Sequence, residues 1–476
     1  MTKAKIYYHD IGDYLSREEK LAIVKKNHSI ANMQWQTLTP NEHGDWLNQR
    51  NDAFSSFIPL EPEKKFDTRT KSFFNTYAIG IATNRDAWVY NFSKQKIAKN
   101  MQRMIDFYNQ QKEMFVEAKK KNPNIEVEKF IDTNETKISW TRALRRDVSK
   151  NIQHKFKENE LNYCLYRPFT KEWIYYDKSF IESPGLWSQI FPTKEHKNLS
   201  IAISGIGQQK DFSILIVNSL SDLQVVDKAQ YFPLYYYEEN KTAQANLFDK
   251  TNENQYIRRD AVSDFILERA KKQYGKNVSK EDIFYYVYGF LHSPQYRETF
   301  AADLKKRLPR LPLVDDVRNF WAFSKAGRAL AELHLNYESA GKYPSVIEIY
   351  NPLNTADTLK QANAKEMEFL NYRVGKMRFP SKTDKSKIIY NSQITVENIP
   401  AEAYEYVVNG KSAIEWIMER YQITTHKKSG IVNNPNDWAK ETGNPRYILD
   451  LLLSVINISV QTVEIVKGLP KVKFEE

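Results

Sequence analysis

Positively charged side chains cluster in the stretch KISWTRALRRDVSKN, residues 137–151. Residues 137–178 contain ten Lys or Arg against five Asp or Glu, in a chain whose whole positive excess is eleven. If the stretch is helical, three or four cations share one face, with Leu144 and Val148 on the opposite side. These cations are Arg142, Arg145, Arg146 and Lys150. Guanidinium groups match phosphate oxygens and the O6/N7 edge of guanine, and lysine neutralises phosphate as a point charge.

This stretch predicts a contact with nucleic acid, and Lys137 and Trp140, which stand among the same charges, are predicted to share in it. The alternative is a solvated helix face with Asp147 as a partial counterion, because runs of charge are usually solvated faces. Two neighbouring segments favour the first interpretation.

In LYRPFTKEWIYYDKSF, Arg167 and Lys171 fall on a predicted hairpin turn that could project into a groove. In GIGQQKD, Gln208 and Gln209 carry amides that can pair bidentately with adenine, beside Lys210 for phosphate. The aromatic residues after the turn are more typical of a core than of a base-stacking platform, since strand alternation buries one of each neighbouring pair.

Motifs for catalysis or for a cofactor are not found. Gly410-Lys411-Ser412 resembles the end of a P-loop, but Glu405 stands where the phosphate-wrapping glycine is required. Gly205-x-Gly207 leads into a strand and predicts a hairpin turn rather than a dinucleotide loop. None of the Asn-Pro pairs continues into the Pro-aromatic sequence typical of amino-methyltransferases. We therefore predict no catalytic, cofactor-binding or metal-binding residues in this chain.

One group of acidic residues and a histidine in TPNEHGDWLNQRND is compatible with a metal site, but its spacing favours a turn and a helix start. The group comprises Glu42, His43, Asp45 and Asp52.

Composition indicates a folded, basic protein of about two to four domains. The chain has 476 residues, 41% of them hydrophobic, and its net charge of +11 favours an anionic partner. Cys164 is the only cysteine, so we expect no disulfide within the chain. We expect the Cys164 side chain to be a small buried hydrophobic group rather than a nucleophile. The N-terminus has no secretory signal, and 447–466 predicts a buried helix rather than a membrane span. The expected location is the cytoplasm.

Periodicity predicts an α+β fold with strands and helices in separate blocks. Ser16 and Glu19 predict a capping box, and residues 94–121 predict a helix. Residues 160–237 predict one sheet of about five strands. Residues 257–345 predict helices capped at Ser279 and Ser293, and residues 400–476 mainly helices. Between them, residues 370–397 predict strands at 371–379 and 386–396.

Six segments resemble the C-terminal part of type ISP restriction–modification enzymes. They are IYYHDIGDYLSREEKL, TPNEHGDWLNQRND, TNRDAWVYNFS, YRPFTKEWIYYD, YGFLHSPQYRETFAADLKKRLPRLP and GKSAIEWIMERYQ…SGIVNNPNDW. Such enzymes join nuclease, helicase-like ATPase and adenine methyltransferase regions to a target-recognition domain. The resemblance implies that S-adenosylmethionine, ATP and Mg serve regions absent from this chain, which is not expected to be catalytic alone.

The resemblance also implies a division of the chain. Residues 1–50 are expected to be the trailing part of the methyltransferase region and 51–155 a helical connector. Residues 156–350 are expected to be a mixed or antiparallel β-rich target-recognition core of strands then helices, and 351–476 a C-terminal α/β part of the specificity region that ends in helices. The predicted partners are double-stranded DNA and the upstream regions or subunits, with no membrane. Two alternatives stay open: a subunit that completes a methyltransferase or nuclease with a separate partner, and a protein-interaction scaffold.

Overall fold

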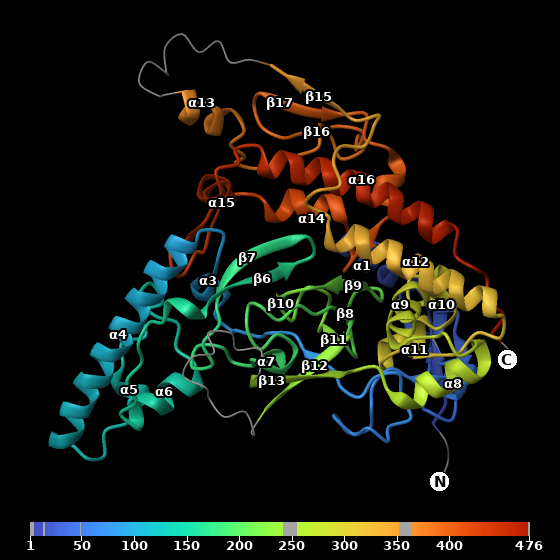
Figure 1. Cartoon of the computed structure of the whole chain (residues 1–476), viewed down its shortest axis with the longest axis horizontal. Helices are drawn as coiled ribbons and strands as arrows, with labels where there is room; N and C mark the ends of the chain where they lie inside the picture. Colours follow the sequence, from blue (N-terminus) through green and yellow to red (C-terminus); the bar gives the residue numbers. More distant parts are fainter. Residues whose placement is uncertain (1–3, 13–14, 48, 241–254, 352–363, 475–476) are drawn as a thin grey trace.

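The computed structural model describes residues 4–12, 15–47, 49–240, 255–351 and 364–474. Helices and small sheets occupy separate regions of the molecule, which confirms the predicted α+β class. Figure 1 shows a helical arm at one end, small sheets in the middle, and a helical bundle at the other end. The helices nearest the C-terminus run along the top of this arrangement in the same view.

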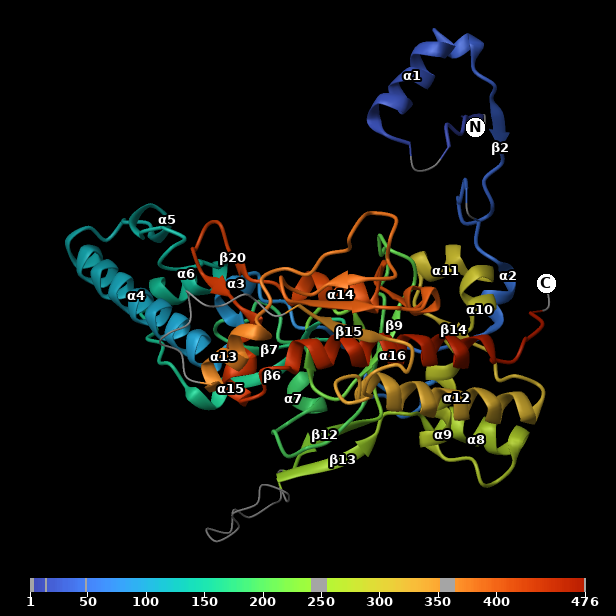
Figure 2. The same cartoon turned by 90° about the horizontal axis from the view of Figure 1, so that it is seen from above.

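The N-terminal segment stands away from the rest of the molecule (Figure 2). Strand β1 (Ile6–Tyr8) pairs with β2 (Gln36–Leu38), and α1 (Arg17–Asn27) lies between them in the chain. The predicted capping box is confirmed, because Ser16 and Glu19 exchange side-chain and backbone hydrogen bonds. No described residue of α1 is buried. A short helix, α2 (Asp52–Ser56), follows where the chain enters the main body.

The helical arm consists of α3 (Asp86–Val89), α4 (Lys94–Lys121), α5 (Val127–Phe130) and α6 (Arg142–Ser149). The predicted 94–121 helix is confirmed, and the Ser93 side chain caps it by accepting from the Lys96 amide. Its apolar residues recur at the helical period and are buried, so the stripe fixes which face of α4 meets the other helices.

The strands of residues 160–237 are divided among two four-stranded sheets and a two-stranded ribbon that contains Tyr235–Glu239, so the predicted single five-stranded sheet is wrong. One sheet has the order β10 (Leu220–Ser221), β6 (Leu161–Arg167), β7 (Thr170–Tyr175), β5 (Tyr90–Asn91). The other has the order β4 (Ala78–Ile79), β11 (Gln230–Pro233), β8 (Ser200–Ile203), β9 (Ile214–Val217). Strands β4 and β5 come from residues 78–91 and take an edge in each sheet, which local strand signals cannot reveal.

The sheet containing β8 and β9 is buried on both faces and joins two hydrophobic cores. Ile201, Ile203, Ile214 and Ile216 belong to the core formed with the helical bundle. The intervening Ala202, Leu215 and Val217 belong to the larger core formed with the arm and the C-terminal helices. Alternation along a strand therefore assigns successive side chains to different cores.

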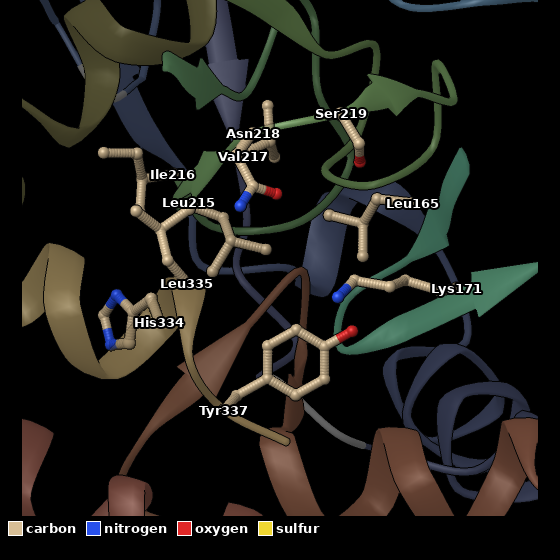
Figure 3. Close-up of a pocket in the computed structure, with 10 residues that line it drawn as sticks. All are labelled: Leu165, Lys171, Leu215, Ile216, Val217, Asn218, Ser219, His334, Leu335 and Tyr337. Atoms are coloured by element: carbon tan, nitrogen blue, oxygen red, sulfur yellow. The ribbon is translucent and has the colours of Figure 1, made fainter. Parts of the chain in front are cut away.

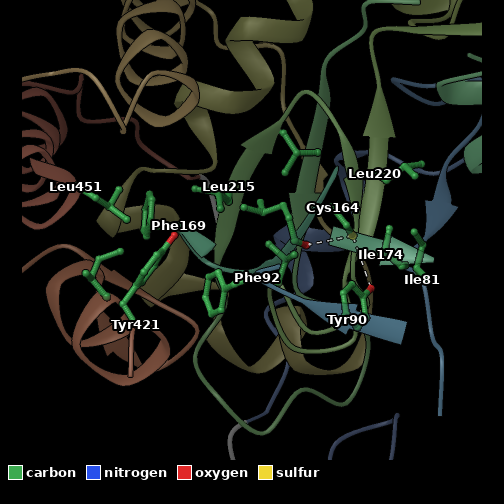
Figure 4. Packing of buried hydrophobic residues seen from close by; sticks show 14 of the residues in the cluster. Ile81, Tyr90, Phe92, Cys164, Phe169, Ile174, Leu215, Leu220, Tyr421 and Leu451 are labelled. Carbon is green, nitrogen blue, oxygen red and sulfur yellow. Dashed lines mark hydrogen bonds between the residues drawn. The ribbon is translucent and has the colours of Figure 1, made fainter. Parts of the chain in front are cut away.

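Cys164 lies inside the larger core, which confirms the prediction that it is a buried side chain (Figure 4). Its sulfur is 3.6 Å from the hydroxyl oxygen of Tyr90, and Ile81, Ile174 and Leu220 pack nearby in the same view. Burial raises the pKa of the Cys164 thiol well above its usual value, so the reactive thiolate is disfavoured.

The bundle comprises α8 (Asp264–Tyr274), α9 (Lys280–Phe290), α10 (Pro294–Thr299), α11 (Ala301–Lys306) and α12 (Val317–Leu335). The predicted caps at Ser279 and Ser293 are confirmed, with Pro294 at the first helical position. The C-terminal helices are α14 (Ala413–Arg420), α15 (Pro435–Thr442) and α16 (Tyr447–Lys467). Within the described residues, α16 is the one helix that is apolar and long enough to cross a membrane. Of its most apolar 18-residue stretch, 72% is buried inside the protein.

The predicted strand at residues 371–379 is wrong. Helix α13 (Ala364–Asn371) runs into this segment, and Arg378 makes an isolated bridge with Ile389. Side chains from the neighbouring turn bind the carbonyls that a strand partner would have used: the Asn391 amide donates to Asn371, and the Tyr390 hydroxyl donates to Tyr372. The strands of this region are β15 (Ile347–Tyr350), β17 (Ile394–Glu397) and β16 (Ile388–Ile389), in that order.

The remaining elements of the described residues are short. They are β3 (Ile58–Pro59) with β14 (Arg310–Leu311), α7 (Trp187–Ile190), β12 (Tyr235–Glu239) with β13 (Tyr256–Asp260), β18 (Val407–Val408) with β19 (Lys411–Ser412), β20 (Thr424–Thr425) with β21 (Val432–Asn433), and 3-10 turns at 30–32, 158–160 and 401–404. Asn409 and Gly410 form the two-residue turn between β18 and β19 with positive φ values of 51° and 80°, a hairpin geometry rather than a P-loop.

Helices α9 and α12 cross where Gly289 faces Gly327. A Cβ added to Gly327 would collide with the Tyr285 carbonyl oxygen, and one added to Gly289 would collide with the Phe323 carbonyl oxygen. The absence of both side chains therefore permits backbone-to-backbone contact between these helices.

We predict that Gly327→Ala lowers the free energy of unfolding by about 2 kcal/mol. Overpacking against rigid backbone costs about 3 kcal/mol, and the better helix propensity of alanine returns about 1 kcal/mol. The measurement is the urea unfolding midpoint. Gly375→Ala is the matched control, because nothing lies within 4 Å of its added Cβ. Equal midpoints for the two variants would contradict the close crossing.

Candidate nucleic-acid interface

The predicted cationic helix is present as α6, with its apolar side buried as expected. Leu144 and Val148 are buried, whereas Arg142, Arg146 and Lys150 are exposed. The Thr141 hydroxyl caps the helix by accepting from the Leu144 amide. The Asp147 carboxylate faces inward to His154 at 3.1 Å and lies 3.6 Å from the Arg146 guanidinium. The exposed cations of α6 are therefore only weakly neutralised by the protein.

The other predicted residues of this stretch are more constrained. Arg145 is half-buried, and its Nε is buried without a partner among the described residues. Lys137 is exposed, and its ammonium group lies 2.8 Å from Asp132. Trp140 donates its indole N–H to the Asp132 carbonyl and packs 5.9 Å from the Tyr108 ring, so its ring is held against the arm.

The expected projection of Arg167 and Lys171 from the β6–β7 turn is wrong, because both side chains point into the protein. Arg167 donates to the Asp222 carboxylate at 2.8 Å and is 3.5 Å from Asp86. Lys171 pairs with Glu338 and lies 5.2 Å from the centroid of the Tyr337 ring. In Figure 3 the Lys171 side chain reaches toward Tyr337 beside a cavity of about 10 Å³, which holds at most one water molecule.

The 205–210 loop connects β8 to β9 as the predicted hairpin connection. Gln208 is buried and donates its amide to the Leu304 carbonyl at 2.9 Å, so its expected reach to a base edge is also wrong. Gln209 and Lys210 are exposed. The Lys210 stem lies close to Gly410.

The predicted residues do not share one surface. Helix α6 lies in the arm at one end of the molecule, whereas β8 and β9 lie beside the bundle in both views (Figures 1 and 2). The expected single concave surface is therefore not formed by these three segments. The exposed members that stay predicted contacts are Lys137, Arg142, Arg146, Lys150, Gln209 and Lys210, with the half-buried Arg145 beside them.

The group of Glu42, His43, Asp45 and Asp52 forms a turn and a helix start, as the spacing favoured. The Asn41 side chain accepts from the His43 and Asp45 amides. Arg50 and Lys306 bind the Asp45 carboxylate, and these hydrogen bonds hold the pKa of Asp45 well below its usual range. Across the described ranges, no three His, Cys, Asp or Glu side chains are grouped as metal ligands would be.

A polar cleft of about 850 Å³ was missed by sequence reasoning. The α3 turn, β7, the end of α14 and the β20–β21 ribbon surround it. Side chains from these separate segments line it, among them Arg85, Glu172, Arg420, Gln422 and Lys428. One sequence signal could have indicated it: His426-Lys427-Lys428 is a short basic run ahead of Gly430, whose φ is +70°. The three basic side chains are exposed at the tip of the β20–β21 ribbon.

Glu172 lies in this cleft with 2% of its surface exposed. Burial raises the pKa of Glu172 to about 7, and the hydrogen bond that its carboxylate accepts from the Asn433 amide at 2.8 Å opposes the rise. The side-chain oxygen of Asn433 accepts from the Phe92 amide at 3.0 Å, so Asn433 fixes the ribbon to β7 and to the residue after β5.

Comparison with known proteins identifies the class. Residues 72–451 match the family model described as the Type ISP C-terminal specificity domain. The chain belongs to this family, which confirms the resemblance. No curated protein matched the chain.

Three solved structures are similar over nearly the whole chain. The nuclease-deletion mutant of the Type ISP restriction–modification enzyme LlaGI, in complex with a DNA substrate mimic, is 38% identical with a TM-score of 0.81 over 99% of this chain. The ATP-dependent Type ISP enzyme LlaBIII, bound to DNA, is 35% identical with a TM-score of 0.82 over 99% of this chain. The DrdV–DNA complex is 27% identical with a TM-score of 0.79 over 98% of this chain. This chain spans 40%, 28% and 43% of those chains, respectively.

We predict that Glu172→Gln removes a pH-dependent loss of stability. The pKa of Glu172 is about 7 in the folded chain against 4.5 for an ordinary glutamate. The folded state therefore binds the proton more tightly, and the free energy of unfolding falls as pH rises through this window. The neutral amide avoids the loss, so the variant is expected to exceed wild type by about 1–3 kcal/mol at pH 8 and to match it near pH 4.5.

The measurement is urea unfolding at both pH values. Glu268→Gln is the matched control, because it removes the same charge at an exposed position on α8. A gain for Glu172→Gln of the same size at both pH values would contradict the titration of Glu172.

Proposed function

We propose that this chain recognises a specific double-stranded DNA sequence as the specificity region of a Type ISP restriction–modification enzyme. It holds the site for adenine-N6 methylation and for cleavage by regions outside this chain, in the cytoplasm of a bacterium or archaeon. Use of S-adenosylmethionine, ATP and Mg belongs to those other regions in this proposal. The observation that carries it is similarity over 99% of the chain to LlaGI, solved with a DNA substrate mimic, and to LlaBIII, solved bound to DNA.

The charge distribution supports the proposal independently. The net charge of +11 favours a polyanionic partner. In the part of the chain that the structure describes, Asp147 is the carboxylate that pairs with an exposed cation of α6, Arg146, and it also binds His154. We assign these cations to the phosphate backbone, which positions a protein without reading sequence.

Selection from a random duplex library tests sequence recognition directly. The chain is expected to enrich one sequence and to bind it at least about 10³-fold more tightly than a scrambled duplex. Equal affinity for all duplexes at 100 mM salt, or no affinity, would sink the proposal.

We predict that Arg142→Ala/Arg146→Ala weakens binding to the selected duplex and to the scrambled duplex by the same factor. Each lost phosphate contact lowers the slope of log affinity against log salt by about one, so the double variant is expected to lose about two. Fluorescence anisotropy over a salt series measures both quantities.

Lys271→Ala/Lys272→Ala removes the same charge from exposed positions on α8, at the opposite end of the molecule, and serves as the control. If the α6 variant keeps the wild-type slope, the assignment of α6 to the phosphate backbone is wrong.

A further inference from the structure

Arg85 is a buried arginine that forms no ion pair with any carboxylate of the described residues. It stands just before α3 and lines the polar cleft, with 4% of its surface exposed. Its Nε and Nη1 atoms are buried and have no hydrogen-bond partner among the described residues. Glu182 attracts the Arg85 guanidinium but lies beyond ion-pair distance. The centroid of the Phe180 ring is 5.9 Å from the guanidinium carbon.

Burial of an unpaired charge is energetically unfavourable, so such a group is normally paired or hydrogen-bonded. Burial also lowers the pKa of Arg85 to about 10, which still leaves it charged near neutral pH. The free chain therefore presents an unneutralised cation at the cleft.

The carboxylates of the cleft are already bound by other groups. Asp86 accepts from the Thr83 and Tyr166 hydroxyls and lies near Arg167. Glu419 pairs with Lys411 and Arg420, and Glu135 pairs with Lys428 at 3.0 Å. Glu172 accepts a hydrogen bond from Asn433. Burial raises the pKa of Glu172 to about 7, so part of the Glu172 population is protonated and uncharged near neutral pH. An entering anion would meet Arg85 without displacing a protein ion pair.

The shape of the cleft rim favours nucleic acid over a small anion. The β20–β21 ribbon forms one wall, and its tip exposes Thr424, Thr425, His426, Lys427 and Lys428. A two-stranded ribbon fits the major groove of DNA, and basic tips contact its phosphates. A phosphate satisfies Arg85 better than a guanine edge does, because the guanine edge carries no full negative charge.

We infer that the cleft between α3 and the β20–β21 ribbon binds a backbone phosphate of DNA through the Arg85 guanidinium. The inference rests on the proposed function and adds a contact to it. The bound phosphate is the counterion that Arg85 lacks among the described residues.

Arg85→Gln separates a ligand-binding arginine from a structural one. The variant loses an unpaired buried charge, so its unfolding midpoint is expected to equal or exceed that of wild type. Its affinity is expected to fall by about 10-fold to 100-fold, equally for the selected and the scrambled duplex, with a salt slope lower by about one. Arg269→Gln, on exposed α8, is the control for loss of one charge.

A methylphosphonate scan of the duplex identifies the phosphate. One neutralised position is expected to weaken wild-type binding and to leave binding by Arg85→Gln unchanged. Wild-type DNA affinity in Arg85→Gln, or a drop in its unfolding midpoint together with its affinity, would overturn the inference. Inorganic phosphate that stabilises wild type as much as the duplex does would overturn the assignment to DNA. If wild type binds no duplex at all, the proposed function fails instead.

Discussion

The neutralisation of buried charge determines how the central part of this molecule is arranged. Arg167 is 15% exposed at its side chain and is balanced by Asp222 and Asp86, which come from distant parts of the chain. This ion pair joins β6 to the loop after β10 and to α3. Arg85, directly before Asp86, is buried as deeply but has no carboxylate within reach of an ion pair among the described residues. The first arginine is neutralised within the fold, and the second is the one that we infer to be neutralised by a DNA phosphate.

The doubly buried sheet connects the bundle to the rest of the molecule. Strands β8 and β9 alternate between two cores, so neither the bundle nor the arm can shift without disturbing both. The cleft lies on the arm side of this sheet, framed by segments around residues 85, 172, 420 and 424–433. Asn433 binds Glu172 and the Phe92 amide, which connects the ribbon to the strands beneath it.

Local signals in the sequence were sufficient for helices and caps. Ser16, Ser279 and Ser293 cap helices as predicted because a capping hydrogen bond closes within three residues. Strand pairing was predicted less well, because β4 and β5 join sheets whose other strands lie 70 to 150 residues away in the chain. The strand predicted at residues 371–379 failed because Asn391 and Tyr390 bind its carbonyls.

The residues of the candidate site also differ in how well the sequence predicts their positions. The cations of α6 could be predicted, since helical period alone separates them from Leu144 and Val148. Arg167, Lys171 and Gln208 could not be assigned correctly, because their partners Asp222, Glu338 and Leu304 lie 55, 167 and 96 residues away. The cleft could not be predicted from the sequence, because the side chains that line it come from separate segments.

The most direct measurement is the structure of this chain bound to the duplex that it selects. The account predicts a phosphate oxygen within about 3 Å of the Arg85 guanidinium, with the β20–β21 ribbon against a groove. DNA bound on another face, with Arg85 still buried and unpaired, would contradict it.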